Sequence, residues 1–246
     1  MNDELTERLK VLRLGALLAH WDDYLKMAAK ERLSHGRLLT HIIDEEYRIK
    51  RENACRLRLK RAQIPEPYVI ETYPFDQQPK LNRKMVLALY DSFEYMTAHR
   101  NIIWLGPTGC GKTGLATSFL TNAIEKGHTG RYVPFADLID ELYRSVADHS
   151  EQNVLKRYLG YDCLLIDEIG YVEVEPVQVG LFFTLMHKRH KQKPTLITSN
   201  LGFDDWGGFL QNAHLTAALI DRLTESSHVI NMKGCRSLRP KREHNT

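Results

Sequence analysis

The sequence predicts an α/β protein in which helices cover both faces of a parallel sheet, with a small helical domain before it. Two observations lead to this fold class. From Leu81 onward, five short β-prone runs alternate with helical stretches, and their spacing of about 30 residues leaves room for one helix in each crossover. In the first 62 residues, apolar side chains recur at steps of three and four. A chain of 246 residues is long enough to hold both units.

The composition is that of an ordinary globular protein. Apolar residues make up 43% of the chain and charged residues 26%, which excludes disorder and fibrous repeats. No apolar run approaches the roughly 20 residues that span a bilayer, and MNDELTERLK lacks the apolar core of a signal peptide, so we expect a cytoplasmic protein. The cysteines form no CxxC pair, which indicates reduced thiols rather than zinc ligands or a disulfide framework. They are Cys55, Cys110, Cys163 and Cys235.

Residues 1–62 are expected to form a domain of two or three helices. Apolar residues follow helical steps from Leu5 to Ala19, and a break follows at Ser34-His35-Gly36. Ser34 is suited to cap the next helix, because a serine hydroxyl can accept a backbone N–H of the first turn. Beyond the break the steps continue through Leu39, Ile43 and Tyr47.

Residues 63–80 are expected to connect this helical domain to the α/β domain. They hold four prolines and no periodic pattern. Proline fixes φ and removes a backbone donor, so a regular element is disfavoured here. The α/β domain then covers 81–240, and 241–246 form a basic tail. Its expected strands are NIIWL (101–105), RYVPF (131–135), CLLID (163–167), TLITS (195–199) and HVINM (228–232).

The stretch GPTGCGKT, residues 106–113, has the pattern of a loop that grips nucleotide phosphates. Its glycines permit backbone angles that let successive N–H groups point at phosphate oxygens. Lys112 brings a positive charge to the β and γ phosphates, and the Thr113 hydroxyl can ligate Mg²⁺. The alternative is a chance match, but a strand precedes the loop and a helix follows it, as the motif requires. The residues expected to bind ATP are Gly106, Pro107, Thr108, Gly109, Cys110, Gly111, Lys112 and Thr113.

An acidic pair, Asp167-Glu168, ends the apolar run CLLID about 50 residues after this loop. The end of a strand in this position lies beside the loop, where a metal ion and an attacking water would sit. We expect Asp167 to hold Mg²⁺, mainly through its water shell, and Glu168 to orient or deprotonate the hydrolytic water. The alternative is a strand end with no chemical role.

Two further residues complete the expected catalytic set. Asn200 ends the run TLITS, where its amide can hydrogen-bond both the water and the γ phosphate; the alternative is a turn residue that caps the strand. Arg222 in LIDRL is the candidate arginine finger, a guanidinium that stabilises charge in the transition state, and the alternative is a surface ion pair with Asp221. As a finger it would enter a neighbour's site, which implies a homo-oligomer.

Positive charge is concentrated in two places. Seven basic residues stand between positions 48 and 61 against one acid, Glu52, and five stand between 233 and 246, also against one acid. The first group is either a solvated helix face or a surface that binds polyanions such as DNA with little sequence preference. Its members are Arg48, Lys50, Arg51, Arg56, Arg58, Lys60 and Arg61. A third basic run, HKRHKQK (187–193), follows an expected helix, where cations interact well with the helix dipole.

With these motifs in this order, the sequence resembles the AAA+ ATPases and, within them, the small DnaC-like clade. The helical leader that begins LRLGALLAHWDDYLK, the connector that ends in Phe75-Asp76, and YVPFADLIDEL resemble the IstB-like ATP-binding proteins, which serve the transposase of bacterial insertion sequences. The resemblance runs from about Leu12 to Arg239. It implies a five-stranded sheet of order 5-1-4-3-2. The sequence departs from larger AAA+ proteins in ending soon after the fifth expected strand, so we expect no C-terminal lid domain, and Arg236 is only a weak stand-in for the arginine that such a lid supplies.

The resemblance also implies a function. It points to an ATPase that binds double-stranded DNA as an ATP-dependent oligomer, selects or remodels target DNA, and recruits or activates its transposase. One alternative is a loader of the replicative helicase. Another is a nucleotide-switched DNA-binding module in which hydrolysis is incidental, and a metabolic P-loop kinase is more distant because no acceptor-site pattern follows the acidic pair.

Overall fold

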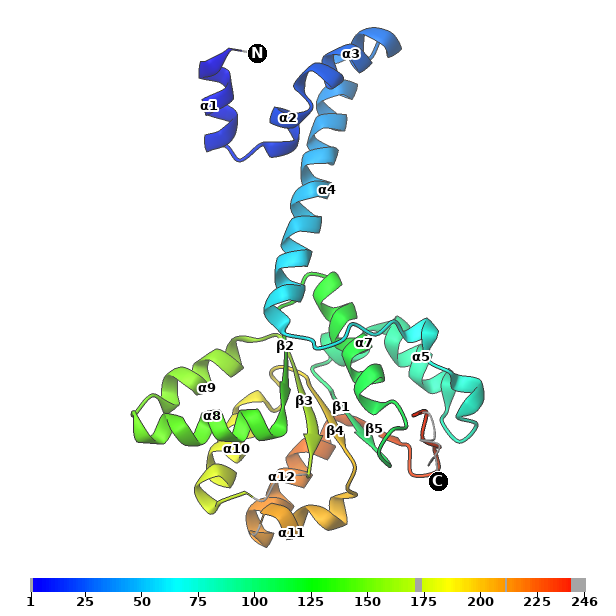
Figure 1. Ribbon diagram of the computed structural model, residues 1–246, viewed down its shortest axis with the longest axis vertical. Coiled ribbons are helices and arrows are strands. Elements are labelled where there is room, and N and C mark those ends of the chain that lie inside the picture. Colours follow the sequence, from blue (N-terminus) through cyan, green and yellow to red (C-terminus); the bar gives the residue numbers. More distant parts are fainter. Residues whose placement is uncertain (1, 171–173, 211, 240–246) are drawn as a thin grey trace, which may run out of the picture. The chain divides into compact units, whose positions relative to one another are not determined.

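The computed structural model describes residues 2–170, 174–210 and 212–239 (Figure 1). The expected basic tail, 241–246, lies outside these residues. The chain divides into two compact units, Met1–Leu57 and Arg58–Thr246. Across the described residues, no helix is both long and apolar enough to cross a membrane.

The first unit is helical, as expected, but its described residues form four helices instead of two or three. A residue with positive φ, Arg13, follows the first helix and separates it from the second. The carboxylate of Glu46, which is buried, accepts the backbone N–H groups of Ala16 and Leu17 at 2.9 and 3.1 Å and so fixes the start of the second helix. The helices are α1 (Asp3–Val11), α2 (Gly15–Ala19), α3 (Trp21–Glu31) and α4 (His35–Ala62), the last of which continues into the second unit.

Helix α4 begins directly after Ser34, whose Oγ accepts the N–H of Arg37 at 3.4 Å, in agreement with the expected cap. The apolar steps on α4 are helical, but in the single chain they do not lie in a core. Leu39, Ile43 and Tyr47 are 59%, 64% and 65% exposed. The periodicity therefore predicted the helix correctly without indicating what its apolar side contacts.

The second unit is built on a parallel five-stranded sheet of order β2-β3-β4-β1-β5. This is the predicted order 5-1-4-3-2 counted from the other edge, and the prediction is confirmed. The strands are β1 (Asn101–Leu105), β2 (Gly130–Pro134), β3 (Cys163–Ile169), β4 (Thr195–Ser199) and β5 (Ser227–Asn231). β1 is buried at every residue, as expected for the middle of a sheet with two covered faces.

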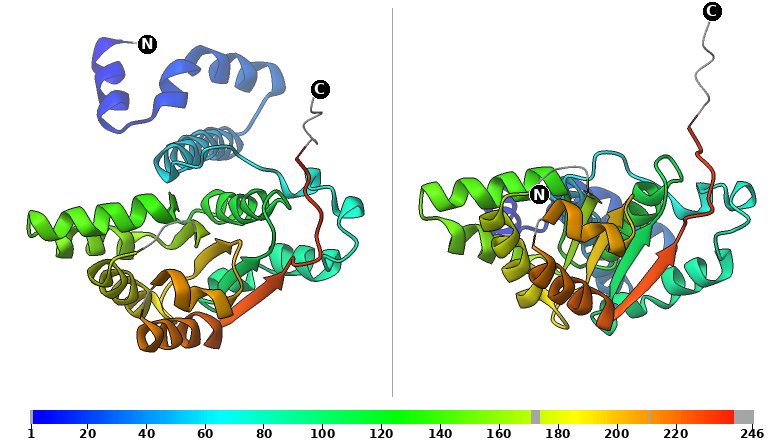
Figure 2. Two further views of the ribbon diagram at one scale, coloured as in Figure 1. Left: turned by 60° about the horizontal axis from the view of Figure 1, so that its bottom comes forward. Right: turned by 90° about the horizontal axis from the view of Figure 1, so that it is seen from below.

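Helices cover both faces of the sheet, which gives three layers (Figures 1 and 2). On one face, Ile102 and Trp104 of β1 pack in a core with α5 (Arg83–Ser92), α6 (Glu94–Thr97) and α7 (Lys112–Glu125). On the other face, Ile103 and Leu105 pack in a second core with the remaining helices. These are α8 (Phe135–Ala147), α9 (Glu151–Gly160), α10 (Pro176–Arg189), α11 (Trp206–Leu210) and α12 (Ala213–Glu225). Because successive side chains of a strand point to opposite faces of the sheet, β1 contributes residues to both cores.

The connector packs against the sheet domain and forms two short 3-10 helices, η1 (Ile70–Thr72) and η2 (Phe75–Gln77); a third, η3 (Phe203–Asp205), precedes α11. Ile70, Tyr73 and Phe75 are buried in the same core as α7. The Tyr73 hydroxyl donates to the carbonyl of Cys110 at 2.7 Å, which joins the connector to the glycine-rich loop. The connector therefore forms part of the surroundings of that loop.

Candidate nucleotide-binding site

The glycine-rich loop lies between β1 and α7, as its sequence context requires. Gly109 and Gly111 have φ of +82° and +89°, a region that side chains other than glycine rarely enter. Helix α7 begins at Lys112, directly after the second of these glycines. The free N–H groups of its first turn and its dipole favour an anion at this point.

The Lys112 side chain is buried and lies under the loop. Its Nζ donates to the carbonyls of Gly106 and Pro107 at 2.8 and 2.9 Å and to Asn200 Oδ1 at 2.5 Å. Burial lowers the pKa of this ammonium, because a charged group loses hydration there. The two residues expected at the phosphates, Lys112 and Asn200, are thus in direct contact across the tips of β1 and β4.

Asp167 is buried at the end of β3 and lies beside the loop. Its carboxylate accepts hydrogen bonds from Thr113 Oγ1 at 3.0 Å, from the Tyr132 hydroxyl at 2.9 Å and from Thr198 Oγ1. Burial and the adjacent carboxylate raise the pKa of Tyr132, so the phenol stays a donor. A carboxylate next to a threonine hydroxyl at the phosphate loop is a set of oxygen donors that suits Mg²⁺. Water and phosphate oxygens would complete the coordination of the ion. Thr113 and Asp167 therefore fit the metal site expected from the sequence.

Glu168 stands at an irregularity of β3. The register with β4 shifts between Ile166 and Ile169, and Glu168 has a φ of +61°. Its N–H donates to Thr198 Oγ1 at 2.9 Å in place of a ladder carbonyl. This backbone conformation costs on the order of 1 kcal/mol for a residue other than glycine. As a result Asp167 is buried while the side chain of Glu168 is exposed at the pocket.

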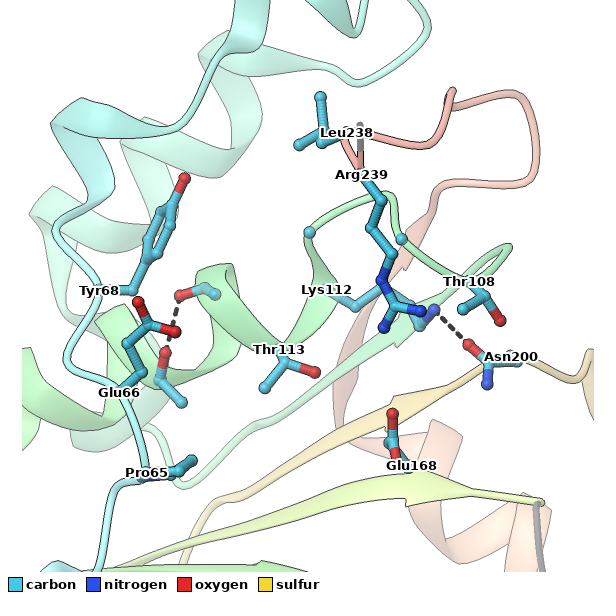
Figure 3. Close-up of a pocket in the computed structure, with 14 residues that line it drawn as sticks. Pro65, Glu66, Tyr68, Thr108, Lys112, Thr113, Glu168, Asn200, Leu238 and Arg239 are labelled. Carbon is cyan, nitrogen blue, oxygen red and sulfur yellow. Dashed lines mark hydrogen bonds between the residues drawn. The ribbon is translucent and has the colours of Figure 1, made fainter. Parts of the chain in front are cut away.

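A pocket of about 850 Å³ lies at the glycine-rich loop, with Glu168 and Asn200 in its lining (Figure 3). One end holds Lys112, Glu168 and Asn200, and the other end holds residues of the connector, including the ring of Tyr68. The full lining is Pro65, Glu66, Tyr68, Thr108, Gly109, Gly111, Lys112, Thr113, Gly114, Thr117, Glu168, Asn200, Leu238 and Arg239. A charged end and an end with an aromatic ring match the phosphates and the base of a nucleotide.

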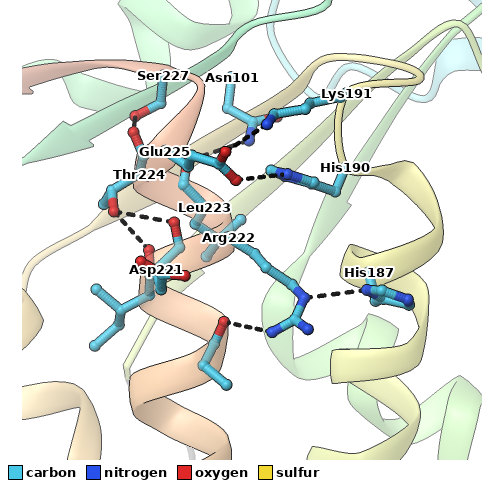
Figure 4. A network of polar contacts seen from close by, with 12 residues as sticks. Asn101, His187, His190, Lys191, Asp221, Arg222, Leu223, Thr224, Glu225 and Ser227 are labelled. Atoms are coloured by element: carbon cyan, nitrogen blue, oxygen red, sulfur yellow. Dashed lines mark hydrogen bonds and ion pairs between the residues drawn. The ribbon is translucent and has the colours of Figure 1, made fainter.

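Arg222 lies away from this pocket, on α12 (Figure 4). Its Nε donates to His187 Nδ1 at 3.0 Å, Nη1 donates to the carbonyl of Ala218 at 3.1 Å, and its guanidinium lies 4.9 Å from the ring centre of Phe183. Within the described parts of the chain it forms no ion pair with Asp221. Arg222 therefore does not reach the nucleotide pocket of its own chain.

The basic group between 48 and 61 lies on α4, where two of its members have acidic partners. Arg48 bridges Glu45 and Glu52 at 2.8 and 2.9 Å, and Lys50 lies 3.8 Å from Glu46. More of the positive charge of this group is therefore paired with acidic side chains than was expected from Glu52 alone. Arg51, Arg56, Lys60 and Arg61 are exposed, and Arg58 is half-buried.

Three groups near the pocket were missed in the sequence. Thr198 stands two residues before Asn200 in TSN, so its place at the strand end could have indicated its contact with Asp167. Tyr132 could have been found only from the pairing of β2 with β3. Arg239 lines the pocket, whereas Arg236, the weak candidate from the sequence, does not. Arg236 instead borders a separate cavity beside Asp76, Gln77 and Pro79.

A family model described as IstB-like ATP binding protein matches residues 7–246. The chain belongs to the IstB-like ATP-binding proteins. It is 32% identical over 231 residues to a protein of insertion sequence IS21 from Pseudomonas aeruginosa whose name describes ATP binding, with 94% of this chain and 87% of the relative covered. The corresponding protein of IS232 from Bacillus thuringiensis subsp. berliner is 29% identical, with 94% and 92% covered. Membership in a family of insertion-sequence proteins agrees with the resemblance in the sequence.

Solved structures support the fold of this IstB-like chain. The DnaC helicase loader has a TM-score of 0.54 at 20% identity, with 70% of this chain and 97% of the other covered. DnaA from Aquifex aeolicus, bound to the ATP analogue AMPPCP, has a TM-score of 0.55 at 17% identity, with 68% and 50% covered. The α/β domain therefore has the AAA+ fold predicted from the sequence.

Proposed function

We propose that this IstB-like protein is a Mg²⁺-dependent ATPase that acts in DNA transposition. The observation that carries the proposal is the convergence of Lys112, Thr113, Glu168 and Asn200 on one pocket at the glycine-rich loop, where Asp167 accepts a hydrogen bond from Thr113. These residues come from β3, the end of the adjacent strand β4 and the start of α7. They provide a cation that can bind phosphate, an oxygen ligand for a metal ion, and a carboxylate and an amide that can hydrogen-bond a water molecule.

In this proposal each residue acts on the phosphate chain or the attacking water. Lys112 exchanges its bonds to the loop carbonyls and Asn200 for oxygens of the β and γ phosphates. The freed Asn200 amide hydrogen-bonds the γ phosphate and the water, and Glu168 orients that water and accepts its proton. Thr113 and Asp167 would hold Mg²⁺, which when bound would neutralise negative charge on the phosphate chain.

Replacement of Lys112 tests the nucleotide site. Lys112→Ala removes the buried ammonium, so ATP affinity measured by calorimetry should fall by about 100-fold or more. Lys84→Ala, which removes an exposed lysine of α5, is the control and should bind ATP like the wild type. An unchanged affinity in Lys112→Ala would contradict the assignment of the pocket.

The insertion-sequence relatives and the basic group on α4 support a role on DNA. We propose that ATP-bound subunits assemble on double-stranded DNA in the bacterial cytoplasm and recruit or activate the cognate transposase there. A neighbour's Arg222 would complete each site, which is in keeping with its distance from the pocket of its own chain. Hydrolysis would then release the subunits.

The DNA proposal predicts a particular salt dependence. Each cation that neutralises a phosphate contributes about 0.9 to the slope of log affinity against log salt. Arg56→Ala with Lys60→Ala should therefore reduce the slope for every DNA sequence tested. Arg8→Ala with Lys10→Ala, on α1, removes the same charge elsewhere and should leave the slope unchanged. Co-purification with the transposase in ATP, and not with the replicative helicase, separates this function from helicase loading.

A further inference from the structure

The guanidinium of Arg222 on α12 is held against α10 by three contacts (Figure 4). Its Nε donates to His187 Nδ1 at 3.0 Å, its Nη1 donates to the carbonyl of Ala218 at 3.1 Å, and its Cζ lies 4.9 Å from the ring centre of Phe183. Since an arginine nitrogen can only donate, the Nδ1 that faces it must carry no proton. Neutral His187 is therefore the acceptor that orients this side chain.

The imidazole of His187 is itself fixed from the side of the core. Phe183 and His187 stand one turn apart on α10, so their side chains lie on the same face of the helix. Their rings are parallel within 2°, with centroids 6.1 Å apart. Phe183 packs against the core on this face of the sheet, whereas His187 is exposed. An exposed acceptor is thus held in one place by a ring that is anchored in the core.

The partners of Arg222 are neutral, although an acid stands nearby on the same helix. Glu225, three residues further along α12, is engaged by α10 instead: it pairs with Lys191, and His190 Nε2 lies 3.0 Å from its Oε2 (Figure 4). Within the described residues, no carboxylate forms an ion pair with Arg222 and no acceptor lies within hydrogen-bond reach of its Nη2. A carboxylate would compete with a phosphate for the guanidinium, whereas an imidazole and a carbonyl orient it and leave its charge available.

We propose that His187 is the positioning residue of Arg222 and, together with Phe183, orients the guanidinium in the free subunit for the nucleotide site of a neighbour. This role of His187 rests on the proposed function, in which Arg222 acts in trans. A long arginine side chain loses rotational freedom when it is fixed in a site. Orientation before assembly removes that loss from the step in which two subunits complete the site.

Substitutions of His187 in the full chain test this role. His187→Ala should lower the rate of ATP hydrolysis about three- to tenfold, because one hydrogen bond to a charged group is lost, and ATP affinity should not change. His187→Asn should retain most of the rate, since its amide oxygen can accept the same N–H. His187→Phe keeps a ring beside Phe183 but has no acceptor, so it should be as slow as His187→Ala. His214→Ala, at an exposed histidine of α12, is the matched control and should hydrolyse ATP like the wild type.

Mixed assemblies show which subunit carries the defect. Lys112→Ala subunits should raise the hydrolysis rate of His187→Ala subunits, because they offer a correctly held Arg222 to an intact pocket. A chain with both Lys112→Ala and His187→Ala should restore the activity of Arg222→Ala subunits several-fold less well than Lys112→Ala alone. A purely structural effect of His187 on its own pocket would instead stay with the subunit that binds ATP, and that result would overturn the proposal.

The arginine and the histidine should also fail as a unit. His187→Ala combined with Arg222→Ala should be no slower than Arg222→Ala, whereas additive losses would overturn the role of His187. Faster hydrolysis in His187→Ala would likewise overturn it, because the contact would then restrain the arginine. If Arg222→Ala hydrolysed ATP at the wild-type rate, the proposed action of Arg222 in trans would itself fail. Slow hydrolysis in Arg222→Ala with a wild-type rate in His187→Ala would overturn the role of His187 alone.

Discussion

Thr198 Oγ1 accepts the backbone N–H of Glu168 at 2.9 Å and donates to the carboxylate of Asp167, so one hydroxyl positions both members of the acidic pair. Thr198→Val keeps the shape of the side chain and removes both bonds. We expect ATP hydrolysis to fall by about 10- to 100-fold, because the N–H of Glu168 and a buried carboxylate each lose a partner. ATP affinity should change much less. A steady-state hydrolysis assay with a parallel binding measurement checks this.

Thr198→Ser is the control for that substitution. It retains the hydroxyl and loses only a methyl group, so its hydrolysis rate should lie within a few-fold of the wild type. Equal rates in the valine and serine variants would mean that the hydroxyl does not position the acidic pair.

Glu168 has an exposed carboxylate in the pocket, and its backbone is held independently of that group. Glu168→Gln should therefore bind ATP with wild-type affinity and hydrolyse it at least 100-fold more slowly, since the amide cannot accept the proton of the water. If hydrolysis releases subunits from DNA, this variant should also stay on DNA longer in ATP. If Glu168→Gln hydrolysed ATP at the wild-type rate, another residue would have to accept the proton of the water.

Arg222 does not reach the pocket of its own chain, which leads to a test of action between subunits. Arg222→Ala should hydrolyse ATP slowly although its pocket is intact, and Lys112→Ala should fail to bind ATP. In a mixture, a Lys112→Ala subunit can offer its arginine to the intact pocket of an Arg222→Ala neighbour, so part of the activity should return. Mixtures no more active than the separate variants would exclude a finger in trans.

Local patterns in the sequence predicted most of the sheet domain. The strands and the phosphate loop depend on short runs of residues, and the acidic pair follows directly from the end of one run. The contacts of Tyr132 and Arg239 depend instead on which distant segments lie side by side. Tyr132 reaches Asp167 because β2 pairs with β3. Arg239 lines the pocket on the segment after β5, whose Arg236 backbone is hydrogen-bonded by Gln78, 158 residues earlier in the chain.

The same distinction explains two other results. Helical periodicity on α4 predicted a helix, but it could not indicate whether Leu39, Ile43 and Tyr47 contact a core. In HKRHKQK the sequence suggested cations that interact with a helix dipole. One of them, Arg189, is instead fully buried at the end of α10. Charge alone did not distinguish this arginine from its exposed neighbours, because its partners are carbonyls from other segments.

Arg189 leads to a prediction about stability. Its guanidinium is 1% exposed and donates to Thr195 Oγ1 at 3.0 Å and to three backbone carbonyls at 2.8–2.9 Å. Those carbonyls belong to Tyr158, Tyr161 and Pro194. Burial lowers the pKa of Arg189 to about 10, which reflects the cost of placing the charge there. The bonds offset that cost and join the ends of α9 and α10 to β4.

Arg189→Ala should lower the free energy of unfolding by about 3 kcal/mol or more, since it leaves a cavity and removes the partner of several buried acceptors. Arg189→Lys should be intermediate, because one ammonium cannot reach all four acceptors. Lys188→Ala, at an exposed neighbour, should stay within about 0.5 kcal/mol of the wild type. Urea unfolding of the three variants checks the order. If Arg189→Ala unfolded at the same urea concentration as Lys188→Ala, the network would contribute nothing to stability, and the buried charge would need another explanation.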